Sequence, residues 1–197
     1  MNTTLRKSIL GIAGLTAAAG LAAGPLNHST TTGNELTPTT PIAAVQADKP
    51  DMGKLLPHGT PSNQSHVDLN DEQIANVKAI IAATKKAGMD ERAAVVSIAT
   101  ALQESKLENL GHLGDRNDHD SQGLFQQRPS SGWGTVEQIT DPEYSTLAFL
   151  KGLKQVDGWQ DMPLTQAAQT VQVSAYPDHY AQWEQQAADL VAQHWTS

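Results

Sequence analysis

A single carboxylate follows the most apolar stretch of the chain. Residues 93–102 are Ala, Val, Ile and Leu with one Ser and one Thr, and Glu104-Ser105 follow after Gln103. At helical spacing, Glu104 shares a face with Thr100 and Ser97, which are smaller and more polar than the Val/Ile/Leu face opposite. Partial desolvation at such an edge favours the protonated carboxyl group that a general acid needs. A helix-end glutamate in open solvent is the alternative that spacing alone leaves open.

Further acidic side chains and two histidines gather in a polar loop region, at residues 112–120. They could supply a second catalytic carboxylate, from Asp115, Asp118 or Asp120. They could also bind a divalent cation, since the residues from 118 onward match the first half of a calcium loop. The twelfth position is Pro129, however, where such a loop requires a bidentate Glu. We therefore predict no metal site, and a solvated polar loop is the third interpretation.

The elements that must position these groups are predicted to be helices. Asn70 and Gln73 form a capping-box pattern for a helix that stops at Gly88. Asp90 begins the apolar helix that leads to Glu104. Asp141 before Pro142 begins a third helix at about 142–153, and two more are expected at about 165–174 and 178–191. No segment alternates well enough to form a long strand, so the fold class is predicted to be all-α.

The composition fits one exported domain. A chain of 197 residues predicts one domain, and because only 5 % of them are aromatic, the core must rely on Ala, Val, Ile and Leu. The chain has no cysteine, which excludes disulfides, thiolate metal sites and a cysteine nucleophile. Its formal net charge of −8 argues against a nucleic-acid partner, because phosphate binding requires a basic face.

The N-terminal region has the pattern of an export signal. Arg6 and Lys7 precede an uncharged, Ala/Gly-rich run, so residues 1–24 are predicted to be a signal peptide, with cleavage as late as residue 47 as an alternative. An uncleaved membrane anchor is the competing interpretation, although the run is short for a bilayer span. Residues 25–67, rich in Thr, Pro, Asn, Ser and Gly, are expected to be a disordered linker, and residues 68–197 the folded domain.

Three short motifs in this order resemble the signature of soluble lytic transglycosylases and goose-type lysozymes. They are Glu104-Ser105, the segment Ser121-Gln122-Gly123-Leu124-Phe125-Gln126, and Ser174-Ala175-Tyr176. The stretch 171–177, with Tyr180 and Trp183, also resembles the transglycosylase-like modules of actinobacterial cell-wall enzymes. The chain departs from the family where Asn109-Leu110 stands for Asn-Pro, and where Phe125 stands for the usual Met.

The resemblance implies a compact lysozyme-like helical domain with an active-site cleft. Glu104 would protonate the glycosidic oxygen, and Ser105 would form a hydrogen bond near it. Gly123 would let the backbone approach the sugar, within a substrate-binding segment that continues through Leu124, Phe125 and Gln126. Gln126 would contact sugar or hold the loop, and Tyr176 would orient Glu104.

The resemblance thus implies a secreted, wall-associated enzyme that cleaves the glycan strands of peptidoglycan. With one secure carboxylate, we expect a lytic transglycosylase that needs no cofactor. A lysozyme-type hydrolase would need a second carboxylate from residues 115–120. Two further hypotheses are a wall-binding module without activity and a metal-binding secreted protein. We expect a monomer that makes no stable membrane insertion after export.

Overall fold

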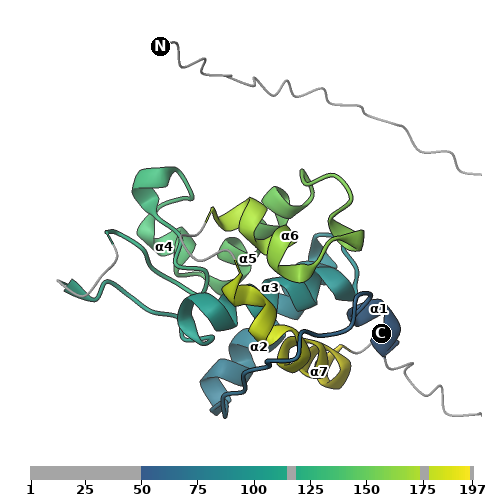
Figure 1. Cartoon of the computed structure of the whole chain (residues 1–197). Helices are drawn as coiled ribbons and strands as arrows, with labels where there is room; N and C mark the ends of the chain where they lie inside the picture. The colour runs from purple at the N-terminus through teal and green to yellow at the C-terminus, as the bar shows by residue number, and fades with distance from the viewer. Residues whose placement is uncertain (1–49, 115–118, 174–177, 196–197) are drawn as a thin grey trace, which may run out of the picture. The chain divides into compact units, whose positions relative to one another are not determined.

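The computed structural model describes residues 50–114, 119–173 and 178–195. Helices hold 60 % of these residues, and no strand is present among them. The nearest approach to a strand is an isolated antiparallel bridge between Gln122 and Gln127. The predicted all-α class is therefore confirmed (Figure 1). The predicted signal peptide, residues 1–24, lies outside the described residues.

Seven α-helices and three 3-10 helices follow one another along this part of the chain. The α-helices are α1 (Met52–Leu55), α2 (Asp71–Lys86), α3 (Glu91–Ser105), α4 (Val136–Ile139), α5 (Pro142–Leu153), α6 (Leu164–Gln172) and α7 (Glu184–His194). The 3-10 helices are η2 (Pro129–Ser131), η3 (Trp159–Asp161) and η4 (His179–Trp183). In this part of the chain no helix is long and apolar enough to cross a membrane.

The caps that the sequence predicted are formed at three helix starts. Asn70 and Gln73 exchange both hydrogen bonds of a capping box at the start of α2. Asp90 accepts from the Ala93 N–H at the start of α3, and Asp141 accepts from the Tyr144 N–H at the start of α5. The last predicted helix is divided, because η4 has 3-10 geometry before α7 begins.

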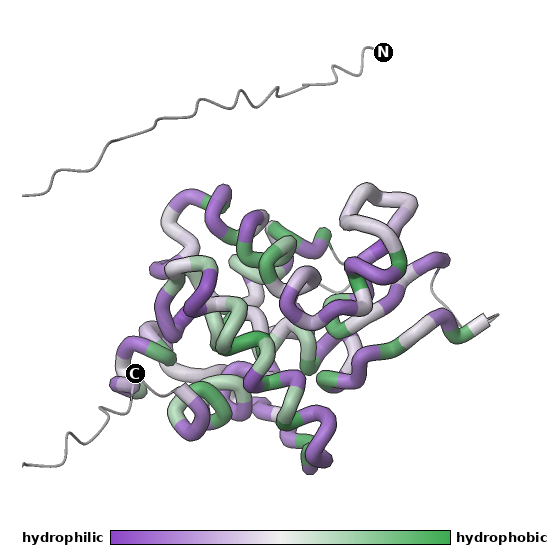
Figure 2. The backbone as a smooth tube through the Cα atoms, turned by 180° about the vertical axis from the view of Figure 1, so that it is seen from behind, coloured by the Kyte–Doolittle hydropathy of each residue, from purple (hydrophilic) through white to green (hydrophobic). Residues whose placement is uncertain are grey.

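Helix α3 lies at the centre of the other helices (Figure 1). Its side chains are buried without interruption from Arg92 to Leu102, as its apolar sequence predicts. It contacts α2 and α7, and also α1, α5, α6 and η4. Along the outer helices, hydrophobic and hydrophilic residues alternate, because each presents one face to this core (Figure 2).

The folded region begins earlier than residue 68, which corrects the predicted linker. Leu55 of α1 is fully buried in the core. Farther along, the Val67 N–H donates to Gln186 of α7, and the Gln186 amide donates back to the Val67 carbonyl. Residues 51–67 thus belong to the folded domain, because one apolar anchor and several backbone contacts hold a stretch that is otherwise polar.

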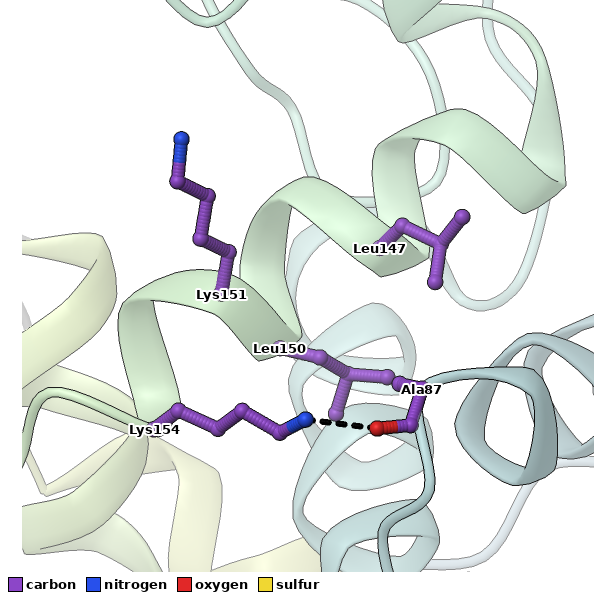
Figure 3. A pocket seen from close by; sticks show the side chains of 5 residues that line it. All are labelled: Ala87, Leu147, Leu150, Lys151 and Lys154. Carbon is purple, nitrogen blue, oxygen red and sulfur yellow. Dashed lines mark hydrogen bonds between the residues drawn. The ribbon is translucent and has the colours of Figure 1, made fainter. Parts of the chain in front are cut away.

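A shallow hollow of about 170 Å³ lies between α2 and α5. The hollow is lined by five residues: Ala87, Leu147, Leu150, Lys151 and Lys154 (Figure 3). The Lys154 ammonium donates to the Ala87 carbonyl at 2.5 Å, beyond the last turn of α2. A cation at a helix C-terminus stabilises the exposed carbonyls and the dipole, so Lys154 serves as a cap between the two helices.

A buried ion pair joins α3 to α7. The Arg92 guanidinium donates to Glu184 at 2.7 Å, and the two side chains are 4 % and 5 % exposed. The same Arg92 nitrogen donates to the Leu55 carbonyl at 2.8 Å, which brings α1 to this point. Two other Arg92 nitrogens, Nε and Nη2, have no hydrogen-bond partner among the described residues. The pair is therefore costly to break, because either charge would be left buried and unpaired.

We expect Glu184→Leu to lower the free energy of unfolding by about 3–5 kcal/mol, because it strands the Arg92 charge. The double variant Arg92→Met/Glu184→Leu should recover most of that loss. Glu143→Leu is the matched control: it removes an exposed ion pair with Lys86 and should cost less than about 1 kcal/mol. Urea unfolding of the four proteins measures these differences. Equal losses at Glu184 and Glu143 would contradict the argument.

Candidate active site

The site begins where α3 ends in a sharp turn. Lys106 and Leu107 adopt left-handed backbone conformations, with φ of 56° and 64°. Their N–H groups donate to carbonyls in the last turns of α3, Lys106 to Leu102 and Leu107 to Ala101. Left-handed conformations are unfavourable for residues other than glycine, so other contacts must hold this turn. Glu104 lies in the last helical turn before it, half-buried.

Two side-chain amides of α2 hold that turn. Gln73 donates to the Lys106 carbonyl at 2.7 Å, and Asn76 donates to the Leu107 carbonyl at 2.9 Å. Gln73 and Asn76 are buried, and Leu107 is fully buried beside them. Orphan carbonyls at a helix end are thereby satisfied from a neighbouring helix. As a result, the last turn of α3 and the glutamate on it have a fixed position.

A tyrosine from η4 orients the predicted catalytic carboxyl group. The Tyr180 hydroxyl donates to Glu104 Oε1 at 2.6 Å, and Tyr180 is fully buried. Hydrogen bonds to a charged acceptor are about twice as strong as neutral ones. The resemblance implied this role for Tyr176, which lies outside the described residues, so that assignment stays a prediction. Tyr180 was named only as part of the resemblance, and its bond to Glu104 was not predicted.

Gln103 connects η4 to α3 next to Glu104. Its Oε1 accepts from the Trp183 indole N–H at 2.9 Å and from the Gln182 amide at 3.0 Å. Tyr180, Gln182 and Trp183 belong to one 3-10 helix, so all three contacts place η4 against the end of α3. Nothing in the sequence spacing indicated these contacts, because about 80 residues separate the partners.

Lys106 places a positive charge close to Glu104. Its ammonium lies 4.5 Å from the centroid of the Trp183 ring and 3.0 Å from the Leu102 carbonyl. Burial lowers the pKa of Lys106, and the negative charge of Glu104 opposes that effect. A cation over an indole face is held by the ring quadrupole. Lys106, which is held over the Trp183 ring, therefore stabilises the ionised form of Glu104.

The Gly-Leu-Phe-Gln segment lies directly against the end of α3. The Ser105 hydroxyl is within hydrogen-bond distance of the Leu124 carbonyl, at 2.8 Å, and of the Ala101 carbonyl, at 3.1 Å. The Gln172 amide at the end of α6 donates to the Phe125 carbonyl at 2.8 Å. Ser105 thus joins two of the three motifs, and its predicted contact with substrate stays a prediction.

Gly123 is required by the packing of the protein itself. Its φ is +78°, and a Cβ at this position would lie 2.1 Å from the Ile139 carbonyl oxygen at the end of α4. Its N–H donates to the Leu110 carbonyl at 2.7 Å. The structure therefore gives a reason for this glycine that differs from the expected approach of a sugar. A side chain here would displace α4 from the segment.

The remaining residues of the segment have mainly structural contacts. Leu124 and Phe125 are fully buried, and the Phe125 ring stacks on Phe149 with centroids 5.1 Å apart. Gln126, with φ of 46°, donates from its amide to the Gly123 carbonyl at 3.0 Å. Gln126 therefore holds the loop, which is one of the two roles that the sequence offered for it. Sugar contacts of these three residues stay predictions.

Of the three candidate second carboxylates, the structure describes only Asp120. It accepts from the Ser130 N–H at 2.8 Å and the Ser130 hydroxyl at 2.7 Å. These hydrogen bonds from Ser130 lower the pKa of Asp120. Asp120 thus holds η2 in place as an ionised group. Asp115 and Asp118 lie outside the described ranges, within which no three His, Cys, Asp or Glu side chains gather to hold a metal ion.

Neither protein-family models nor curated proteins give any match to this chain. What the site can do follows from its own side chains. That site has one half-buried carboxyl group at a helix end, a phenol donor at 2.6 Å and a cation nearby. Such a group can deliver a proton to a bound substrate and take one back, because α2 holds the turn that follows it and Tyr180 holds its carboxyl group.

We expect Tyr180→Phe to let Glu104 stay protonated to a higher pH, because the lost hydrogen bond favours the ionised carboxylate. Hydrogen bonds to charged groups are stronger than those between neutral groups, so the titration midpoint should rise. Carbon-13 NMR of the glutamate carboxyls measures it, with Glu104→Gln to assign the signal. Tyr144→Phe removes a hydroxyl elsewhere and should leave the midpoint in place. An unchanged midpoint in Tyr180→Phe would show that the bond has no influence on Glu104.

Proposed function

We propose that this chain is a secreted enzyme that cleaves peptidoglycan glycan strands, with Glu104 as general acid and base. The observation that carries the proposal is the hydrogen bond from the buried Tyr180 hydroxyl to Glu104 Oε1, at 2.6 Å. The link between Ser105 and the Leu124 carbonyl supports it, because two motifs of the transglycosylase resemblance then meet at one place. The predicted lysozyme-like cleft, the export of the chain and its monomeric state belong to the same proposal.

The reaction proposed is that of a lytic transglycosylase. Glu104 donates its proton to the oxygen that links C1 of N-acetylmuramic acid to N-acetylglucosamine, and the C1–oxygen bond breaks. The Glu104 carboxylate then removes the proton from the C6 hydroxyl of the muramic acid. The C6 oxygen bonds to C1 and closes a 1,6-anhydro ring, and Glu104 is protonated again. No water is consumed and no second carboxylate is required.

The surroundings of Glu104 suit both halves of this reaction. Glu104 must be protonated at the start and ionised after the first step. Tyr180 and Lys106 stabilise the ionised form, so they assist the departure of the proton. Partial burial of Glu104 acts in the opposite direction, because it disfavours the charged form. A group that is balanced in this way can change its protonation state twice in one turnover.

A two-carboxylate hydrolase is the rival reaction. It needs a second carboxyl group about 5–5.5 Å away for retention, or about 6.5–9.5 Å away for inversion. Asp120 already accepts two hydrogen bonds from Ser130, so its carboxylate is used to hold η2 in place. This engagement of Asp120 favours the transglycosylase.

The first test is Glu104→Gln, which we expect to fold normally and to lose activity on purified cell walls by about 10²–10⁴-fold. The amide has nearly the same shape but cannot donate the proton. Glu108→Gln is the matched control, since Glu108 is exposed and lies four residues farther along the chain, beyond the end of α3. Turbidity loss of wall suspensions measures both. Activity of Glu104→Gln within twofold of the parent would remove Glu104 from the mechanism.

The second test concerns the products. The proposed reaction should give 1,6-anhydro ends, lighter than the hydrolysis product by one water and resistant to borohydride. Mass spectrometry of digested peptidoglycan, with and without reduction, identifies them. Reducible muramic acid ends as the main product would instead indicate a hydrolase. In that case Asp115→Asn, Asp118→Asn and Asp120→Asn should each be assayed, since one of them should abolish the activity.

A further inference from the structure

The segment that precedes α2, residues 63–69, lies against η4 and α7. We name it the strap. We propose that the strap is a positioning element of the active site: through Gln64 and Ser65 it fixes η4, and thereby holds the Tyr180 hydroxyl on Glu104. The functional part of this proposal rests on the proposed role of Glu104 as the catalytic acid.

Ser65 is joined to Gln182 by two hydrogen bonds. The Ser65 N–H donates to the Gln182 carbonyl at 2.7 Å, and the Ser65 hydroxyl donates to Gln182 Oε1 at 2.6 Å. The Gln182 amide nitrogen then donates to Gln103 Oε1 at 3.0 Å. Ser65 thus fixes which way the Gln182 amide points. The result is a continuous chain of contacts from the strap to the residue beside Glu104.

Gln64 binds both sides of the junction between η4 and α7. Its amide nitrogen donates to the Ala181 carbonyl at 2.9 Å, and its Oε1 accepts from the Gln185 N–H at 2.8 Å. The first N–H groups of a helix have no partner within it. No side chain at the N-cap position of α7 supplies one, because Trp183 stands there. Gln64 supplies it from a distance of more than one hundred residues in sequence.

The 3-10 helix that carries Tyr180 needs this outside support. It has five residues and no side-chain cap of its own. Helices of this length have poor hydrogen-bond geometry and are not stable alone. Its position must come from its neighbours: α3, α6 and α7 contact it, and the strap binds it through Gln64 and Ser65. A loosened strap would therefore move Tyr180 relative to Glu104.

The test compares Ser65→Ala with Ser62→Ala. Each variant removes one serine hydroxyl, and the two serines lie close together in sequence. Ser62, however, is exposed and makes no side-chain hydrogen bond to the described residues. Ser65→Ala keeps the backbone bond to Gln182, so the fold should persist. We expect kcat on cell walls to fall by about tenfold with KM little changed, less than the 10²-fold that a full 1 Å misplacement can cost. Ser65→Thr retains the hydroxyl and should restore the parent rate. Gln64→Leu removes the side-chain hydrogen bonds to Ala181 and Gln185, and it should lower kcat as Ser65→Ala does.

A second measurement separates positioning from general destabilisation. Carbon-13 NMR of Glu104 should show its titration midpoint moved to higher pH in Ser65→Ala, in the same direction as in Tyr180→Phe, because donation from Tyr180 weakens. In the double variant Ser65→Ala/Tyr180→Phe, the strap substitution should add nothing further. A midpoint that stays at its parent value in Ser65→Ala and in Gln64→Leu would overturn the proposal. An additive shift in the double variant would overturn it too, since the strap would then act by another route.

The two proposals can fail separately. If the parent cleaves no cell wall, the proposed function is wrong, yet the NMR titration still shows whether the strap controls the Tyr180–Glu104 bond. If the parent cleaves walls and Ser65→Ala, Gln64→Leu and Ser62→Ala are all indistinguishable from it, the strap proposal is wrong and the proposed function stands.

Discussion

Helix α3 is enclosed by other helices along its whole length from Arg92 to Leu102, and this burial governs the residues around it. Within α3 the polar side chains must find partners inside the protein, so Ser97 and Thr100 donate to carbonyls one turn back. Arg92 binds Glu184, and that pair fixes α7. Beyond Leu102, at the C-terminal end of α3, the polar side chains of Gln103 and Glu104 are partly exposed. Glu104 therefore appears at the point where the core stops and the polar loop starts.

A carboxyl group in that position is held from several directions. The turn after it uses two strained residues and is supported by amides from α2, while η4 supplies the phenol. Strained conformations that are held by their surroundings are typical of functional sites. The arrangement fixes where Glu104 lies and which way its carboxyl group points.

Much of the scaffold could be predicted from local patterns, because caps and apolar periodicity act over a few residues. The capping box at Asn70, the cap at Asp90 and the central burial of α3 are of this kind. Tyr180 was missed because the motif placed a tyrosine four residues earlier, at Tyr176, and no local rule tells which phenol reaches a helix end. Leu55 was missed because a single anchor in a polar stretch has no periodicity. The reason for Gly123 depends on the Ile139 carbonyl, sixteen residues away, which spacing cannot reveal.

The contacts that fix the site are made mainly by side-chain amides rather than by charges. Gln73 and Asn76 hold the end of α3, Gln172 holds the Gly-Leu-Phe-Gln segment, and Gln64 and Gln186 join the strap to α7. An amide is neutral, so its hydrogen bonds are not weakened by salt or changed by pH, as those of surface ion pairs are. A chain without cysteines can thus keep its loops in place when the ionic strength varies. Because the supporting amides do not titrate, a change of pH can alter the protonation of Glu104 without altering the amide contacts that hold the end of α3.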